Sequence, residues 1–294
     1  MAFDHLEAFE AALGDRLRSG WRDLVDRRGA VRARATEYLL APETQPLVEV
    51  PLWADEAVGG GDRAALHAAV GASMLGYHGL RLQDDLADEG IGEAVPTMLL
   101  ATAAISRAEG LLARITDDDR FWQAHETAMA GFGEAMLAER EFAEHPEGYD
   151  EAAFDQVLRR SAPLATPGLA VLAAADRWAA ADDFSEAVRL AGKAVQIGHD
   201  LVDAKRDLEA GRFTWVLVTL GAHRGGAGLE ERLLTGFDEV VETALGCLDE
   251  ATTLADRVGS PSMLAWATAL TSELERRRTE FWASIFDPSG RSDV

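Results

Sequence analysis

The sequence predicts an all-α protein, a single large helical bundle of about ten or more helices. Apolar residues recur at helical spacing along almost the whole chain, and we find no alternating β-branched runs bounded by hairpin turn dipeptides. No repeat of fixed period is visible, which favours a bundle over a solenoid. At 294 residues the chain fits one large core. We therefore expect one domain over residues 1–288 and a disordered C-terminal tail over residues 289–294.

The first third of the chain is divided by proline, glycine and capping residues. Pro42 and Pro46 end the second expected helix, and a poorly periodic connection follows over Glu43 to Val58. After the glycine turn at 59–61, Asp62 is placed to cap the helix that carries the first acidic motif. The expected helices run over Phe3 to Leu17, Trp21 to Leu40, Arg63 to Asp88 and Pro96 to Leu112.

Capping residues also mark the helices of the remaining chain. Thr116 and the three aspartates after it fit a helix N-terminus better than a second metal site, because acids there complement the helix dipole. Asp150 and Ser260 are further caps, and Asp183 to Glu186 has the spacing of a capping box. After Thr116 and its aspartates, one expected helix runs to about Glu144 and the next covers Glu151 to Arg160. Pro163 and Pro167 break the following apolar helix, which ends near Ala181. The remaining expected helices cover Asp183 to Gly211, Val216 to Gly221, Leu229 to Val258 and Pro261 to near Pro288.

Composition excludes several classes of partner. The chain has 51 acidic and 28 basic residues, a formal charge of -23, which argues against nucleic acid or an anionic membrane surface as the main partner. A polyanionic substrate would have to be received by metal and a few local arginines. The single cysteine, Cys247, excludes an internal disulfide and a thiolate-rich metal site. No secretory signal or membrane-length apolar run is visible, so we expect a soluble, cytoplasmic protein.

The first acidic motif ends a long apolar helical run. Asp84 and Asp88 lie one turn apart on one helical face, and Asp85 flanks them. Carboxylates this close repel one another unless a cation intervenes, and magnesium takes oxygen ligands together with water and substrate phosphate. Arg81, one turn earlier, could neutralise the aspartates in the absence of metal. The motif therefore predicts a magnesium site for a phosphorylated substrate.

Three glycines and a histidine precede this motif on the same helix. Gly71, Gly76 and Gly79 each cost about 1 kcal/mol relative to alanine in a helix interior. Close helix packing and room for a ligand beside the helix explain them equally well. His78 could line a cavity, although a lone histidine on such a helix is more often a packed core residue.

A second acidic stripe lies about a hundred residues downstream. Gln196, Asp200, Asp203 and Asp207 recur at spacings of four, three and four, which places them on one helical face. A solvated surface ridge is the ordinary explanation for one such stripe. Two stripes on long, mostly apolar helices can instead face each other across a central cavity and hold several metal ions that clamp a diphosphate. Lys205 and Arg206 lie off the ridge, where we expect solvent or neighbouring acids as their partners.

These motifs resemble those of a known superfamily. The segment from Asp84 to Asp88 resembles the first aspartate-rich DDxxD motif of class I isoprenoid synthases, and Gln196 to Asp207 resembles their second motif. Gly211-Arg212 is similar to the Gly-Lys that follows the second motif in trans-prenyl diphosphate synthases. Arg160 to Leu164 is similar to that family's Lys-Thr-Ala-x-Leu segment, with arginine in place of lysine. The ordered set covers about half the chain.

The resemblance implies a fold, a cofactor and roles for individual residues. It implies a bundle around a central cavity, a prenyl diphosphate as substrate, more than one Mg²⁺ ion and a possible homodimer. The implied catalytic set is Asp84, Asp85, Asp88 and Asp200. The implied metal ligands are these four together with Asp203 and Asp207. The residues implied near the diphosphate are Arg160, Gln196, Arg212 and Arg81.

Departures from the pattern favour one substrate over two. Glu89 to Val95 contains no basic residue where chain-elongating synthases carry an arginine pair for the allylic diphosphate. Arg28 to Arg34 only weakly resembles their N-terminal element for isopentenyl diphosphate. His199 occupies the first aspartate position of the second motif, and the Asn-Asp-x-x-Ser-x-x-x-Glu motif of bacterial terpene cyclases is absent.

We therefore predict a class I terpene synthase on a prenyltransferase-like scaffold, which ionises one prenyl diphosphate and cyclises the carbocation or eliminates a proton from it. Gly76 and Gly79 would leave the pocket floor open for a chain of fifteen or more carbons. Two alternatives stay open. One is a chain-elongating prenyl diphosphate synthase whose isopentenyl site uses an N-terminal arginine, for which the candidates are Arg27, Arg28, Arg32 and Arg34. The other is a non-catalytic helical partner subunit.

Overall fold

The computed structural model describes residues 2–27, 49–89, 94–224 and 228–286, and within these ranges it contains helices and no strand. The all-α prediction is confirmed. The α-helices are α1 (Ala2–Ala12), α2 (Asp15–Arg27), α4 (Glu49–Ala57), α5 (Arg63–Glu89), α6 (Ala94–Leu112), α7 (Asp119–Glu144), α8 (Glu151–Leu158), α9 (Thr166–Ala174), α10 (Ala181–Glu209), α11 (Trp215–Thr219), α12 (Leu229–Val258) and α13 (Pro261–Phe286). The short 3₁₀ helices are η1 (Pro146–Gly148), η2 (Arg159–Ala165), η3 (Trp178–Ala180) and η4 (Ala222–Arg224).

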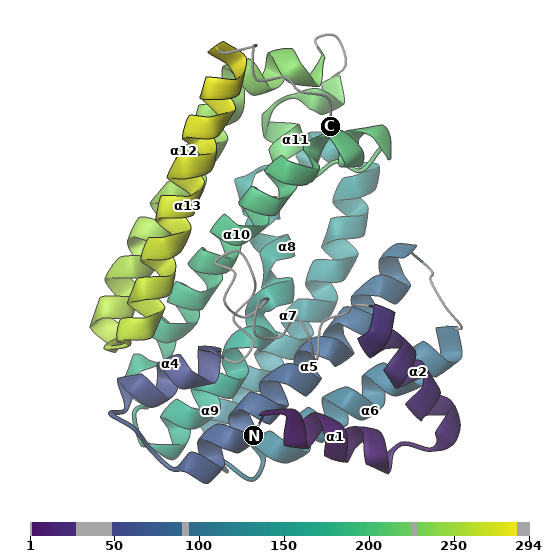
Figure 1. Cartoon of the computed structure of the whole chain (residues 1–294), viewed down its shortest axis with the longest axis vertical. Coiled ribbons are helices and arrows are strands. Elements are labelled where there is room, and N and C mark those ends of the chain that lie inside the picture. The colour runs from purple at the N-terminus through teal and green to yellow at the C-terminus, as the bar shows by residue number, and fades with distance from the viewer. Residues whose placement is uncertain (1, 28–48, 90–93, 225–227, 287–294) are drawn as a thin grey trace.

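The long helices pack in pairs around a continuous apolar core. α5 packs on α6, α10 on α12, and α12 on α13, so that α12 and α13 run side by side along one edge of the molecule (Figure 1). α7 packs against η2 and α8, while α4 lies against α9. The largest fully buried side chains are aromatic, and such rings bury more apolar area than any other side chain. They are Trp21, Trp53, Phe121, Phe154 and Phe184.

Most of the expected helix ends are confirmed. α5, α6, α7, α12 and α13 begin and end within a few residues of the predicted positions. Asp118 caps α7 by accepting a hydrogen bond from the Arg120 amide, and Asp150 caps α8 by accepting one from the Ala153 amide. α10 closes with Gly211 at φ +71°, a left-handed conformation that glycine adopts without strain.

The first predicted helix, Phe3 to Leu17, was wrong, because the structure has two helices that break around Gly14. The Arg18 guanidinium, in the first turn of α2, donates hydrogen bonds to the Glu10 and Ala11 carbonyls at 3.1 and 3.2 Å. The last carbonyls of α1 have no partner within the helix, and these bonds satisfy them. α2 then passes through Trp21, where the second helix was expected to begin, to Arg27.

The connection predicted over Glu43 to Val58 was also wrong in its second half, where α4 forms. Pro51 stands in the first turn of this helix, a position that needs no amide donor. α4 buries Trp53 and Ala54 against its neighbours. The Glu56 carboxylate accepts hydrogen bonds from the Ser260 hydroxyl and the Ser262 amide at 2.8 and 3.0 Å, which joins α4 to the start of α13.

The predicted capping box at Asp183 to Glu186 does not begin a helix. α10 starts earlier, at Ala181, and no side chain caps it. Asp183 lies in its first turn, where its charge complements the helix dipole. Glu186 accepts hydrogen bonds from the Arg189 guanidinium at 2.6 and 2.7 Å instead of reaching back to the helix start.

Gly71 and Gly79 of α5 are sites of close helix packing. A Cβ on Gly79 would lie 2.6 Å from Ile105 Cγ1 and 3.0 Å from the Ala101 carbonyl oxygen of α6. A Cβ on Gly71 would overlap the His5 ring of α1, at 2.3 Å. The hypothesis that Gly79 opens a pocket floor is therefore wrong, since the α6 backbone occupies that space.

Within the described residues, no helix has both the length and the apolar character to cross a membrane. The arginine-rich segment 28–34, most of the segment 89–95 and the tail 289–294 lie outside the described residues. Cys247 is partly buried on α12, and burial raises the pKa of its thiol.

Candidate active site

The first acidic motif lies in the last turns of α5. Asp84 is buried, at 6 % exposure, and Asp85 is half-buried. The Arg81 guanidinium pairs with both: its Nη1 lies 2.5 Å from Asp84 Oδ2 and its Nε lies 3.3 Å from Asp85 Oδ1. Asp88 lies in the last turn of the same helix. Because Arg81 precedes Asp84 and Asp85 by about one helical turn, its guanidinium can pair with both carboxylates.

One oxygen of the first motif lacks a hydrogen bond. Asp84 Oδ1 is buried and has no partner among the described residues. Burying a carboxylate oxygen without a partner is costly, so such an atom is a natural ligand for a cation.

The second acidic stripe forms one face of α10. Asp200 and Asp207 are buried, at 6 % and 7 % exposure, while Asp203 is partly exposed. Asp203 pairs with Arg206 at 2.7 Å, and Asp207 pairs with Arg212 at 2.6 Å. Arg206 Nε also lies 3.7 Å from Asp207 Oδ1. The ion pair with Asp207 therefore holds Arg212, which follows Gly211, at the C-terminal end of the acidic stripe.

Arg160 connects the stripe to α7. It lies in η2, and its Nη1 donates hydrogen bonds to both Glu139 carboxylate oxygens at 2.8 and 2.6 Å. Its Nη2 donates to Gln196 Oε1 at 3.0 Å, and Gln196 Nε2 donates to Asp200 Oδ1 at 2.6 Å. The chain Glu139, Arg160, Gln196 and Asp200 thus links α7, η2 and α10 through side chains alone.

Both acidic motifs act on Arg160 electrostatically. Burial alone would lower the pKa of Arg160, but the negative charges of Glu139, Asp84 and Asp200 raise it above its ordinary value. Asp84 comes from α5 and Asp200 from α10. The fold therefore brings one buried carboxylate from each motif into the field of the same guanidinium.

Asp200 is the most perturbed carboxyl of this group. Burial raises its pKa to about 7, although the hydrogen bond from Gln196 and the charge of Arg160 act in the opposite direction. Tyr149 is buried nearby, and its pKa is raised by burial first and then by the charges of Glu139 and Asp200. A cation beside Asp200 would favour its charged form.

Glu139 is the site residue that the sequence did not reveal. Its neighbours Arg140 and Glu141 make it look like part of a solvated surface. A signal is nevertheless present, because Glu139 lies four residues after Ala135 and seven after Phe132, both of which are buried on α7. These spacings place it on the buried face of the helix.

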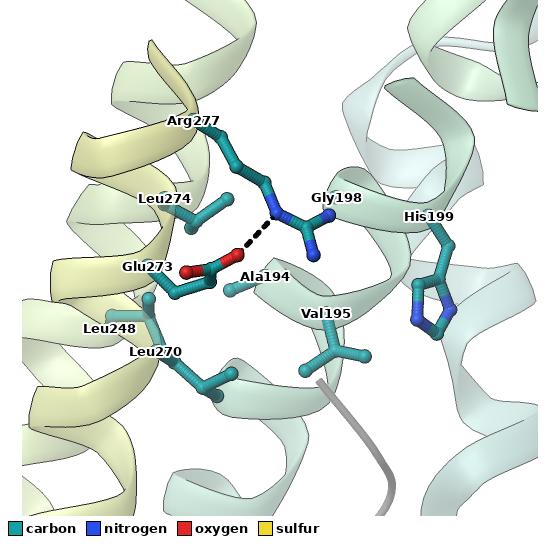
Figure 2. Close-up of a pocket in the computed structure, with 9 residues that line it drawn as sticks. All are labelled: Ala194, Val195, Gly198, His199, Leu248, Leu270, Glu273, Leu274 and Arg277. Carbon is teal, nitrogen blue, oxygen red and sulfur yellow. Dashed lines mark hydrogen bonds and ion pairs between the residues drawn. The ribbon is translucent and has the colours of Figure 1, made fainter. Parts of the chain in front are cut away.

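The other predicted residues lie apart from this chain. His78 is buried on α5 and makes edge contacts with Trp21 and Tyr77, at centroid distances of 5.6 and 5.5 Å, as expected for a packed core histidine. His199 is exposed and borders a small apolar pocket between α10, α12 and α13 (Figure 2). Lys205 is exposed.

The pocket beside His199 has a different character from the acidic site. Figure 2 shows the ion pair of Glu273 and Arg277 on α13 facing Gly198 of α10, while His199 lies on the far side of α10 from this pair. The Arg277 Nε donates to Glu273 Oε1 at 2.7 Å, and hydrogen bonds from Arg276 and Arg277 lower the pKa of Glu273 to about 2. The site residues on α5 do not line this pocket.

The acidic residues fit magnesium by chemistry, although the structure does not present them as a preassembled cluster. Among the residues it describes, no group of three or more His, Cys, Asp or Glu side chains is arranged to hold a metal. Magnesium commonly uses only one or two carboxylates and completes its shell with water and phosphate oxygens. The unpaired Asp84 oxygen and the buried Asp200 carboxyl are such donors.

The described residues form an all-α fold that is similar to the fold of a solved polyprenyl synthase. A crystal structure of a polyprenyl synthase from Roseobacter denitrificans superposes with a TM-score of 0.61 over 94 % of this chain and 97 % of that one, at 17 % sequence identity. No protein-family model matches the chain. No curated protein sequence matches it either.

Proposed function

We propose that this protein is a magnesium-dependent class I terpene synthase on a prenyltransferase-like scaffold. It would ionise a prenyl diphosphate of fifteen or more carbons and cyclise the carbocation or eliminate a proton from it, with release of diphosphate. The observation that carries the proposal is Arg160, which Glu139 and Gln196 hold in place while the charges of Asp84 and Asp200 act on it from two helices.

The proposal assigns a role to each of the predicted site residues. Asp84, Asp85, Asp88 and Asp200, with Asp203 and Asp207, would hold the magnesium ions, which when bound supply positive charge for the leaving diphosphate. Arg160 would bind the diphosphate through donors already oriented by Glu139. Arg81 and Arg212 now pair with aspartates of the two motifs, and they would turn toward the diphosphate when cations replace them.

A chain-elongating prenyl diphosphate synthase is the second candidate. A solved structure with a similar fold is named a polyprenyl synthase, which favours this alternative. Against it stands the absence of basic residues over 89–95, where chain-elongating synthases carry an arginine pair for the allylic diphosphate.

The test is product analysis with the full chain. The protein is incubated with Mg²⁺ and farnesyl or geranylgeranyl diphosphate, with and without isopentenyl diphosphate. We expect diphosphate release and a terpene product that do not depend on isopentenyl diphosphate. A longer prenyl diphosphate formed only when isopentenyl diphosphate is present would overturn the proposal in favour of chain elongation.

The same assay tests for a non-catalytic partner. Asp85→Ala should abolish magnesium-dependent diphosphate release, whereas Asp249→Ala, at an exposed position of α12, should not change it. If Asp85→Ala left diphosphate binding and its magnesium dependence unchanged, the metal site would be refuted for both enzymatic candidates.

A further inference from the structure

α1 packs against α5 (Figure 1), and two histidines meet at this contact. The rings of His5 on α1 and His67 on α5 lie 4.4 Å apart between centroids, with an angle of 36° between their planes. The His5 ring also rests on Gly71, where a Cβ would lie 2.3 Å from His5 Cδ2. His67 and Gly71 are one helical turn apart, so His5 contacts α5 at two successive turns.

The His5 ring has a buried nitrogen without a hydrogen bond. His5 Nε2 is buried and has no partner among the described residues. An uncharged imidazole leaves one acceptor unsatisfied there, whereas an imidazolium would leave a charged N–H donor unsatisfied, which costs more. The surroundings of this nitrogen therefore favour the neutral ring.

The charges around His5 act mostly in the same direction. Burial is the first cause that lowers the pKa of His5 below its ordinary value, and His67 of α5 lowers it further. Arg107 of α6 and Arg114, which follows α6, add positive charge to the same effect. Asp4 opposes them, but its side chain is 68 % exposed and its Oδ2 lies 3.9 Å from His67 Nε2.

The other contacts of α1 are of different kinds. α2 meets α1 at the end away from His5, where the Arg22 guanidinium pairs with the Glu10 carboxylate at 2.7 Å. Leu6 and Phe9 hold α1 on the core by apolar burial, which pH does not change. Histidine is the side chain whose charge changes near neutral pH, so mild acid acts on this contact through its histidines.

We propose, independently of the proposed function, that His5 makes the docking of α1 on α5 sensitive to mild acid. Protonation would place an imidazolium against His67 and near two arginines, with its buried N–H unpaired among the described residues, so α1 would be held less firmly.

The direction of the pH dependence follows from the preference for the neutral ring. Docking should be strongest above the ordinary histidine pKa of about 6.5 and should weaken as the pH falls from there through the lower pKa of the docked ring. Each pKa unit between the docked and the undocked ring weakens docking about tenfold.

Hydrogen–deuterium exchange of the full chain, read by mass spectrometry from about pH 5 to about pH 8, measures this docking. Observed rates are divided by the intrinsic rates at each pH, so that only opening is compared. Peptides from α1 report on the contact, and peptides from α12 report on the rest of the bundle. In addition, NMR titration of the His5 Cε1 proton in the wild-type chain measures the pKa of His5 directly.

Two variants separate the titration of His5 from other effects of acid. His5→Phe keeps a ring beside Gly71 but takes up no proton. His145→Phe is the matched control, since the His145 side chain is 68 % exposed.

We expect the protection of α1 in the wild type and in His145→Phe to fall toward low pH, by about tenfold for each unit by which the measured pKa of His5 lies below 6.5. The protection of α12 should not follow this fall, and the protection of α1 in His5→Phe should stay constant. An equal loss of α1 protection in His5→Phe and the wild type would overturn the proposal, as would a His5 pKa at or above 6.5. If His5→Phe does not fold, the wild-type exchange and the pKa of His5 decide the question.

Discussion

Arg160 Nη2 lies 3.0 Å from Gln196 Oε1, which joins the start of η2 to the middle of α10. The residues are 36 positions apart, and each has a second partner, Glu139 for Arg160 and Asp200 for Gln196. A diphosphate would meet a guanidinium that is already oriented, which is the arrangement that stabilises developing charge most effectively.

Arg160→Ala should therefore lower kcat/KM for prenyl diphosphate by about a hundredfold or more, because an oriented donor is lost from the site. Arg160→Lys keeps the charge but loses the planar fork that contacts Glu139 and Gln196 together, so its loss should be intermediate. The measurement is diphosphate release at several substrate concentrations. Arg140→Ala removes an exposed arginine of α7 and is the control. Equal activity of Arg160→Ala and Arg140→Ala would contradict the role of Arg160.

Asp84→Asn should remove the stabilisation that magnesium and diphosphate confer together. Ligands that bind only the folded state raise its stability, so Mg²⁺ with inorganic pyrophosphate should raise the Tm of the wild-type protein, and a chelator should reverse the rise. Asp84 has one buried oxygen without a partner, and the uncharged amide is a much weaker ligand. Thermal melts with and without the two ligands measure the effect. Asp249→Asn, on the exposed face of α12, should respond like the wild type; a full rise in Tm for Asp84→Asn would show that Asp84 is not a ligand.

Helical periodicity and terminal residues were enough to predict most of the helices. The start of α13 follows from Ser260-Pro261, a capping residue and a first-turn proline that act locally. α4 was missed because it is short and begins with Glu49-Val50-Pro51, and its stability comes from packing against α9, which periodicity does not report.

The acidic faces of α5 and α10 could be predicted from the sequence, but the side chains from other helices that contact them could not. Spacing alone placed Asp84 one turn from Arg81 and Gln196 one turn from Asp200, and the structure has both contacts. The contact of Arg160 with Glu139 joins residues 21 positions apart on different helices. Such pairs depend on how the helices pack, which local patterns do not encode. For the same reason the sequence left open whether Gly79 packs against a neighbouring helix or makes room for a ligand, and the structure shows that it packs against α6.

Asp200→Asn should stabilise the metal-free protein at high pH and not at low pH. Burial raises the pKa of Asp200 from 3.8 to about 7, so the folded state keeps a proton that the unfolded state has lost at intermediate pH. Wild-type stability therefore falls as the pH rises from about 4 to about 7. The total contribution approaches about 4 kcal/mol at 1.36 kcal/mol per pKa unit.

Asparagine carries no charge at any pH, and its Oδ1 can still accept the hydrogen bond from Gln196 Nε2. Urea unfolding of both proteins in the presence of a chelator, from pH 4 to pH 8.5, measures the difference. The difference should vanish near pH 4 and be largest above pH 7. A difference that does not change with pH would show that Asp200 ionises in the folded protein as it does in the unfolded chain.

Gly79→Ala and Gly110→Ala form a matched pair on facing helices. At Gly79 the new methyl group would meet Ile105 Cγ1 at 2.6 Å and the Ala101 carbonyl oxygen at 3.0 Å, so α5 and α6 must separate. Overpacking of this kind costs about 1–3 kcal/mol. At Gly110 nothing lies within 4 Å of a Cβ, and alanine should stabilise α6 by about 0.5–1 kcal/mol because it restricts the unfolded chain. The free energy of unfolding in urea measures both effects. If Gly79→Ala were as stable as Gly110→Ala, α5 and α6 would not be packed as closely as the structure has them.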